Sequence, residues 1–384
     1  MPARLLTADL LPSFASALRS AERVAVDTEF HAERRYVPKL YLVQVYVPGG
    51  EAWIIDPLDG GILQQAAPAL RSVPWIVHGG SQDIRLLGSA LGGVPEVVLD
   101  TQLGSALLNE RYPEGYASLV QRFLGRTLPK TSTLSDWSRR PLSDEQLRYA
   151  MDDVLRLPEL WQAIERRLED AGRLEAAHLA CAEARAQHLV EPEPTEAWRR
   201  FAAATGMTWR ARAILRELCT WREALAQERN QPPRTLLGDG SVVELAKRPP
   251  RSRDGILANR RFPRSAQKHI DAIWGAIERG RACREADAPS LPERYSSRWR
   301  AMHASQAWAK LVGHEAQVSP RLVFDDERIE SLVMAPPQTR DELRERLGWR
   351  DLVVGDLTWS WLRGASAMRF DGGTPFLAPI DTSS

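Results

Sequence analysis

The order of strand-like and helix-like segments is the feature of this sequence that most restricts its fold. Within the first hundred residues, five short runs are rich in Val, Ile, Leu and aromatic residues and end at turn residues. They are residues 24–30, 40–47, 52–55, 75–78 and 97–99. Short links join the first three runs, whereas helical patterns separate the later ones. We therefore expect an α/β fold with a mixed sheet flanked by helices.

The remainder of the chain has a helical pattern, with apolar residues at three- and four-residue spacing from Gln146 to Leu189. Paired prolines interrupt this pattern at 192–194 and again at 289–292, because proline cannot continue a helix. The sequence predicts an α/β domain followed by all-α helical domains, with a frayed tail after Gly372. The expected boundaries are 1–190 for the first domain, 191–208 for a linker, 209–282 for one helical domain and 296–370 for a second.

Charge is distributed unevenly between these parts, although the net charge of the chain is only +1. Residues 1–170 contain 18 basic and 22 acidic residues, a net charge of −4. Residues 209–281 contain 16 basic and 8 acidic residues, a net charge of +8. An acidic module joined to a basic module suits an enzyme that concentrates cations at its site and binds a polyanion elsewhere.

Several classes of protein are excluded by what the sequence lacks. None of the five lysines follows a glycine, so the phosphate-binding loop of ATPases and kinases is absent and no ATP is expected. The three cysteines have no metal-binding spacing. No run is long and apolar enough for a membrane span, and Asp9 interrupts the N-terminal leucines. We expect those leucines to form a first amphipathic helix capped by Thr7, and we expect a cytoplasmic protein with no membrane partner.

Asp27 and Glu29 are the first candidate site residues. They are two positions apart on a predicted strand, so both carboxylates point to the same face. Two carboxylates on an otherwise apolar strand repel each other and are costly to desolvate, and a divalent cation relieves both effects. Taken alone, an Asp-x-Glu pattern is weak and is often only the end of a strand.

Two later segments add candidates. Tyr149 and Asp153 are four residues apart in a helical pattern and share one face, although Asp152 lies equally close to Tyr149. Asp83 follows a predicted buried strand, and such strand ends commonly face the ligand crevice of an α/β sheet. Each feature alone is also explained by an exposed acidic helix face or by an acidic residue at a helix N-terminus.

Taken together, the three segments are much more specific. Asp27-Thr28-Glu29-Phe30, His78-Gly-Gly-Ser-Gln-Asp83 and Tyr149-Ala-Met-Asp-Asp153 resemble, in order and separation, the three exonuclease motifs of the tyrosine-bearing branch of the DEDD superfamily. The sequences that flank these motifs resemble the ribonuclease D family in particular. They are residues 36–44, Asp100-Thr101-Gln102 and residues 135–142. The family's spacing selects Asp153 over Asp152.

The resemblance extends into the helical half. Residues 218–226, 230–233, 236–239 and 249–250 look like the helicase-and-RNase-D C-terminal (HRDC) domain, a small helical module that binds nucleic acid. The stretch from about Ser297 to Arg363 is similar but more diverged, with its best matches at 319–323 and 329–332.

The resemblance implies a ribonuclease-H-like fold that holds two divalent ions, Mg²⁺ or Mn²⁺. By similarity, Asp27 bridges both ions, Glu29 and Asp153 complete the shell of the first, and Asp83 supports the second. Tyr149 orients the attacking water. Its hydroxyl has an ordinary pKa near ~10, which favours a positioning role over proton removal.

Contacts to the substrate are expected from Thr28, Phe30, His78, Lys130 and Arg140, with Arg139 as a further candidate. Phe30 has core packing as its alternative, His78 a structural hydrogen bond, and the cationic side chains an ordinary solvated surface.

The expected function is that of a 3′→5′ exoribonuclease, which releases nucleoside 5′-monophosphates from RNA 3′ ends. Precursors of transfer RNA and other small structured RNAs are the expected substrates. A Werner-type DNA exonuclease is one alternative, since the carboxylates do not distinguish the sugar. A non-catalytic RNA-binding scaffold is another, although the presence of all four carboxylates and the tyrosine argues against it.

Overall fold

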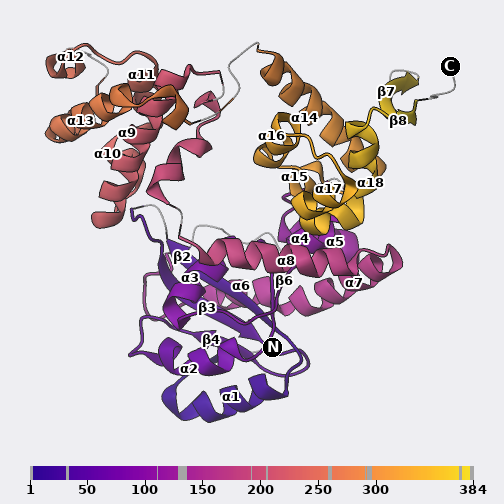
Figure 1. The fold of residues 1–384 in the computed structure, drawn as a ribbon. Coiled ribbons are helices and arrows are strands. Elements are labelled where there is room, and N and C mark those ends of the chain that lie inside the picture. The colour runs from indigo at the N-terminus through magenta and orange to yellow at the C-terminus, as the bar shows by residue number, and fades with distance from the viewer. Residues whose placement is uncertain are drawn as a thin grey trace. The chain divides into compact units, whose positions relative to one another are not determined.

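The chain forms two compact units in the computed structural model (Figure 1). The first comprises Met1–Phe30, Leu40–Val190 and Ala304–Ser384, and the second comprises His31–Lys39 and Glu191–His303. The structure describes residues 3–31, 34–109, 111–128, 136–191, 193–204, 206–257, 262–289, 291, 296–371 and 374–380.

A six-stranded sheet organises the first unit. Its strands are β1 (Arg4–Leu5), β2 (Val24–His31), β3 (Lys39–Tyr46), β4 (Ala52–Ile55), β5 (Trp75–Val77) and β6 (Val98–Asp100). Their order across the sheet is β1-β4-β3-β2-β5-β6. β3 and β4 are antiparallel, whereas β1–β4, β2–β5 and β5–β6 are parallel. The predicted mixed sheet is therefore confirmed.

Helices cover both faces of this sheet, as predicted. Helices α1 (Leu11–Ser20), α2 (Ile62–Arg71) and α3 (Ser81–Leu91) pack against one face, where Val24 and Val26 belong to the buried cluster. Helices α6 (Asp144–Leu155) and α7 (Leu157–Asp170) pack against the other face, around Ala25, Leu42 and Trp161. Three further helices, α4 (Thr101–Ala106), α5 (Tyr116–Leu124) and α8 (Leu174–Leu189), complete this part of the unit.

The expected first helix is present and its helical turns begin after Thr7, which occupies the N-cap position. The residues before Thr7 lie outside it: Arg4 and Leu5 form β1, in register with Trp53 and Ile54 of β4. The amide of Leu6 also donates to the carbonyl of Ile54, at 2.8 Å. The edge of β4 supplies backbone partners that a short helix would forgo. A 3₁₀ turn at Ala8–Leu10 then leads into α1, and the side chain of Thr7 makes no capping hydrogen bond.

The C-terminal helices belong to the first unit from Ala304 onward. They are α14 (Ser297–Glu315), α15 (Pro320–Val323), α16 (Asp326–Met334), α17 (Arg340–Leu347) and α18 (Asp351–Leu362). The expected frayed tail is not what the described residues show. Strands β7 (Ser366–Asp371) and β8 (Thr374–Pro379) pair in an antiparallel hairpin after Gly364, whose φ of +67° ends the helical run.

A buried ion pair fastens these C-terminal helices to α8. The guanidinium of Arg350 is 8% exposed and donates to both carboxylate oxygens of Glu183, at 2.8 and 3.0 Å. The indole Nε1 of Trp349 donates to the same carboxylate at 2.7 Å. The amide of Ser319 donates to the carbonyl of Ala106 in α4, at 2.8 Å. The helices after Ala304 are thus packed against the α/β domain.

The second unit is helical. It contains α9 (Trp209–Glu228), α10 (Pro233–Leu236), α11 (Asp239–Lys247), α12 (Arg253–Leu257) and α13 (Ile270–Ala282). Its buried core includes Leu215, Leu218 and Ile277. The stretch expected as a linker forms 3₁₀ turns at Pro194–Arg200 and Ala202–Ala204, and its Trp198 and Phe201 are buried in the same core.

The connection between β2 and β3 packs on this helical unit. The hydroxyl of Tyr36 accepts a hydrogen bond from Gln227, and the amide of Val37 donates to the side chain of Asn230, both at 3.1 Å. The loop that follows β2 is therefore held by α9 and by the turn after it. Across the described ranges, no helix combines the length and apolar character that crossing a membrane requires.

The ion pair at Glu183 should stabilise the packing of the C-terminal helices. Glu183→Ala leaves the buried guanidinium of Arg350 without its partner, which should lower the free energy of unfolding by about 2 kcal/mol. Urea unfolding, together with the rate of limited proteolysis between α14 and α18, measures this effect. Glu175→Ala, at an exposed position of the same helix, is the control and should change neither quantity. Equal stability of the two variants would contradict the assignment.

Candidate active site

β2 carries the first two site residues on the face that α6 covers. Ala25 belongs to the buried cluster formed with α6, whereas Val24 and Val26 belong to the cluster on the opposite face. Because side chains alternate along a strand, Asp27 and Glu29 share the side of Ala25. Thr28 points to the side of α3. The predicted shared face of the two carboxylates is thus present.

Helix α6 contributes a third carboxylate. Its start is fixed by a capping box, in which the Ser143 hydroxyl accepts from the amide of Gln146 and the Gln146 side chain accepts from the amide of Ser143. This start fixes the direction in which Asp153 points, about two and a half turns later. Asp153, Asp27 and Glu29 each offer a carboxylate oxygen, and these three atoms lie within 4.8 Å of one another. Asp152 is not part of this cluster.

Asp83 lies in the first turn of α3, just beyond the end of β5. Its carboxylate accepts a hydrogen bond from the hydroxyl of Thr28. The loop before it is tied down by Asp100, whose two carboxylate oxygens accept from the amides of Gly79 and Gly80, both at 2.9 Å. A Cβ at Gly80 would lie 2.5 Å from the side chain of Val77, so this approach requires glycine.

Burial raises the pKa values of all four carboxylates, and repulsion within the cluster adds to this for Asp27 and Glu29. Burial, followed by the charges of its three neighbours, holds the pKa of Asp27 well above its usual range. Burial, then the charges of Asp153 and Asp83, raises the pKa of Glu29 to about 8. Burial also raises the pKa of Asp153 to about 7 and that of Asp83 to about 6. Such values are typical of a site designed to hold a cation.

Two tyrosines lie beside this cluster. Burial and the charges of Asp153, Glu29 and Asp27 raise the pKa of Tyr149 to about 12, so its hydroxyl remains protonated and can donate a hydrogen bond. The sequence analysis missed Tyr116. Its hydroxyl donates to the carbonyl of Asp152 at 3.3 Å, and burial together with the charges of Asp153 and Asp27 raises its pKa. No spacing relative to the motifs identifies this residue.

Most of the side chains predicted to contact substrate form bonds within the protein. Arg140 forms a two-pronged ion pair with Asp56 and donates to the carbonyls of Tyr41 and Trp137, at 2.8 and 2.7 Å. The guanidinium thus joins the loop after β4 to the segment before α6, and a contact with phosphate would compete with these bonds.

Thr28 is 6% exposed, and its hydroxyl donates a hydrogen bond to Asp83. Thr28 therefore positions that carboxylate. The His78 Nδ1 lies 2.9 Å from the hydroxyl of Thr101, the structural role given as its alternative. Its ring centre is 5.5 Å from that of Tyr116. Phe30 is half-buried near the end of β2, and Arg139 is exposed and paired with Asp136. Lys130 lies outside the described residues.

The donor set fits a hard divalent cation. All the side chains in the cluster offer carboxylate oxygens, which are the preferred ligands of Mg²⁺ and Mn²⁺. No histidine or cysteine belongs to the cluster among the described residues, so the softer transition metals are less well suited.

Comparison with known proteins identifies the family. A family model described as 3′-5′ exonuclease matches residues 3–169, and a model of the HRDC domain matches residues 211–277. Ribonuclease D of Gluconacetobacter diazotrophicus is 30% identical over 97% of this chain and 95% of its own length. Ribonuclease D of Pseudomonas paraeruginosa is 31% identical over 90% of this chain and 94% of its own.

The fold agrees with these sequence relationships. The crystal structure of Escherichia coli RNase D, described as an exoribonuclease involved in structured RNA processing, superposes with a TM-score of 0.77 at 27% identity. The match covers 95% of this chain and 99% of that structure. With relatives aligned over nearly their whole length and the three motifs at one site, this chain belongs to the ribonuclease D family.

Proposed function

We propose that this member of the ribonuclease D family acts as a 3′→5′ exoribonuclease at the cluster of Asp27, Glu29 and Asp153. Membership of the family gives the reaction type, which is hydrolysis of RNA from its 3′ end. The observation that carries the assignment of the site is the meeting of three carboxylate oxygens within 4.8 Å, contributed by β2 and α6.

Each side chain has a distinct role in this proposal. Asp27, Glu29 and Asp153 hold two divalent cations, Mg²⁺ or Mn²⁺, with the support of Asp83. Cations bound there supply an activated water and stabilise the charge that develops on the phosphate and on the leaving oxygen. Thr28 fixes the carboxylate of Asp83 through its hydrogen bond.

Tyr149 acts as a hydrogen-bond donor in this proposal. A pKa of about 12 makes proton removal by its phenolate unfavourable near neutral pH. Its hydroxyl therefore orients the attacking water or a phosphate oxygen. The product is a nucleoside 5′-monophosphate.

The substrates we propose are precursors of transfer RNA and other small structured RNAs with a free 3′ end. The printed description of the E. coli relative, structured RNA processing, supports this choice. The competing assignment is a DNA exonuclease, since the carboxylates do not recognise the sugar. Matched 5′-labelled RNA and DNA oligonucleotides of one sequence distinguish them: faster removal of deoxynucleotides would exclude our assignment.

Loss of a single cluster carboxylate should abolish hydrolysis. Asp27→Asn and Asp153→Asn should each reduce kcat by more than about 100-fold, because each removes an anionic ligand while preserving side-chain shape. Asp152→Asn is the matched control and should retain most of the activity. A time course on 5′-labelled RNA in Mg²⁺ or Mn²⁺ measures the rates. Near-normal turnover in either cluster variant would refute the metal assignment.

Removing the hydroxyl of Tyr149 should have a smaller effect. Tyr149→Phe should lower kcat by about 10- to 100-fold, since one hydrogen bond is lost while the carboxylates remain in place. Single-turnover kinetics at saturating RNA isolate this step. Identical rates for the two proteins would leave the ring with a packing role against Trp137, whose centre is 6.0 Å away.

The raised pKa values predict how metal binding depends on pH. A cation must displace protons from carboxylates with pKa values of about 7 and 8, so binding should strengthen from pH 6 to pH 8.5. The rise in Tm on adding Mn²⁺ should be larger at pH 8.5. Without metal, the effect of pH on stability has the opposite sign. The folded protein binds these protons more tightly than the unfolded chain does, so the free energy of unfolding falls as pH rises through about 8.

Differential scanning fluorimetry with Mn²⁺ or EDTA at both pH values measures the two effects. Asp153→Asn is the control, because it lacks one titrating carboxylate and should show a weaker pH dependence in EDTA. An Mn²⁺-induced rise in Tm that is equal at pH 6 and pH 8.5 would contradict the linkage.

A further inference from the structure

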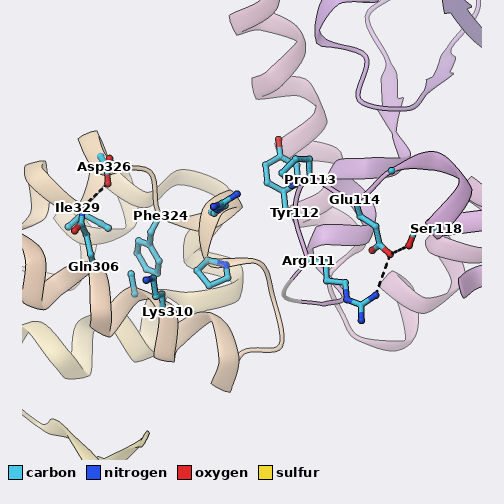
Figure 2. A pocket seen from close by; sticks show the side chains of 14 residues that line it. Arg111, Tyr112, Pro113, Glu114, Ser118, Gln306, Lys310, Phe324, Asp326 and Ile329 are labelled. Carbon is cyan, nitrogen blue, oxygen red and sulfur yellow. Dashed lines mark hydrogen bonds and ion pairs between the residues drawn. The ribbon is translucent and has the colours of Figure 1, made fainter. Parts of the chain in front are cut away.

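A cavity of about 920 Å³ lies within the first unit, between the segment Arg111–Ser118 and the C-terminal helices α14 to α16 (Figure 2). Its volume falls in the ~300–1,000 Å³ range of ligand-binding clefts. Arg111 and Tyr112 contribute to one wall, and Lys310, Arg321 and Phe324 contribute to the other. We call this cavity the seam groove.

The cationic side chains of the seam groove have few partners. Lys310 and Arg321 are exposed, and neither has an ion-pair partner within the described part of the chain. The side chain of Arg111 is 74% exposed, and its ion pair with Glu114 is long: Nη1 lies 3.9 Å from Oε1 of that carboxylate. Three positive charges therefore face solvent at the groove.

The acidic side chains of the groove both accept hydrogen bonds. Glu114 is buried, and its carboxylate accepts from the Ser118 hydroxyl at 2.6 Å and from Arg122 at 2.7 Å (Figure 2 shows the Ser118 contact). Asp326 is exposed and accepts a hydrogen bond from the uncharged Gln306 at 2.9 Å, so it keeps its charge. The three cations outnumber the two acids, one of which is paired with Arg122, and this balance points to an anion as the ligand.

Aromatic side chains line the same groove. Phe324 is buried, and its ring packs edge-on against Trp308 at 5.6 Å between centres, so it forms an apolar floor. Tyr112 is half-buried and lies on the opposite wall, where its ring is available to a base. Cations together with an aromatic face are the combination that binds single-stranded nucleic acid without sequence preference.

The seam groove adjoins a second cavity that reaches the loop before Asp83. Tyr112 and Arg321 also line this second cavity, which has a volume of about 350 Å³ and reaches Gly79 and Asp100. Gly79 lies in the loop that Asp100 ties down just before Asp83. Along the chain, Tyr116 follows Tyr112 by four residues and is close enough to Asp153 for that charge to raise its pKa.

We propose that the seam groove binds single-stranded RNA upstream of the nucleotide that is removed, an inference that rests on the proposed exoribonuclease function. Lys310, Arg321 and Arg111 contact phosphates, and Tyr112 stacks on a base. The last helical domain is thus part of the substrate path, and its packing on α8 through Glu183 and Arg350 keeps the two walls together.

Charge reversal tests the phosphate contacts. The variant Lys310→Glu/Arg321→Glu should bind a fluorescein-labelled 20-nucleotide RNA in EDTA roughly tenfold more weakly at 0.15 M salt. Its plot of log K against log salt should be less steep by about 1.4, since each lost phosphate contact removes about 0.7. Arg19→Glu/Arg369→Glu, which makes the same change in net charge at other exposed positions, is the matched control and should bind as the wild type does.

Kinetics with Mg²⁺ separate this proposal from the proposed function. The Lys310/Arg321 variant should raise KM for the 20-mer with kcat nearly unchanged. Wild-type protein that degrades no RNA would refute the exoribonuclease assignment. Active wild-type protein with equal binding in variant and control would refute the groove alone. If charge reversal lowers the Tm, Lys310→Gln/Arg321→Gln replaces it and should show a weaker effect in the same direction.

Substitution of Tyr112 tests the stacking contact. Tyr112→Leu should weaken RNA binding by about fivefold or more, the low end for loss of a base–aromatic contact. Tyr112→Phe should restore it, because the ring is kept and only the hydroxyl is lost. A Leu variant that binds as well as the Phe variant would remove Tyr112 from the proposed site.

Discussion

Three carboxylates placed within 4.8 Å of one another repel strongly, and much of the first unit is arranged around that repulsion. At an effective dielectric constant of about 20, two unit charges at this separation repel by about 3 to 4 kcal/mol. In the protein without metal, burial together with this repulsion raises the pKa of Glu29 to about 8, and burial raises that of Asp153 to about 7, so protonation relieves the conflict. A divalent cation relieves it by direct coordination, so one electrostatic conflict links folding, protonation and metal binding.

Local structure holds the carboxylates against this repulsion. Strand β2 is paired on both sides, by β3 and β5, which fixes the Cα positions and Cβ directions of its two carboxylate residues. The capping box at Ser143 fixes the start of α6, and Asp100 fixes the loop before α3. Each of these features helps to determine where a carboxylate lies. Preorganisation of this kind is what a catalytic metal site requires.

The sequence predicted the parts of the site that depend on periodicity. Asp27 and Glu29 are two apart on a strand, and Tyr149 and Asp153 are one turn apart on a helix, so each pair was expected to share a face. Periodicity within one element cannot show which elements meet. The family's motif spacing supplied that step, and the same spacing favours Asp153 over Asp152, in agreement with the cluster.

The features that the sequence did not predict depend on long-range partners. Arg140 was a candidate for phosphate because it lies just before the third motif, and its pairing with Asp56, 84 residues away, could not be read from the sequence. The strand at Arg4 and Leu5 was not predicted, because the free edge of β4 with which it pairs is not visible in the local sequence. The loop after β2 reads as an ordinary connection, although Tyr36 and Val37 pack on the helical unit.

Net charge by segment is also an incomplete guide to where RNA binds. The stretch 209–281 has a formal charge of +8, but part of this charge serves the fold. Arg222 is fully buried and donates to the carbonyl of Leu237 and to Asp239, and the buried Arg212 donates to the carbonyl of Pro289. An arginine whose donors are used internally attracts phosphate only weakly. Exposed cations with few partners, such as Lys310 and Arg321, attract phosphate more strongly for each charge. Exposure and pairing, and not the sum of charges, therefore decide which surface can release counterions on binding RNA.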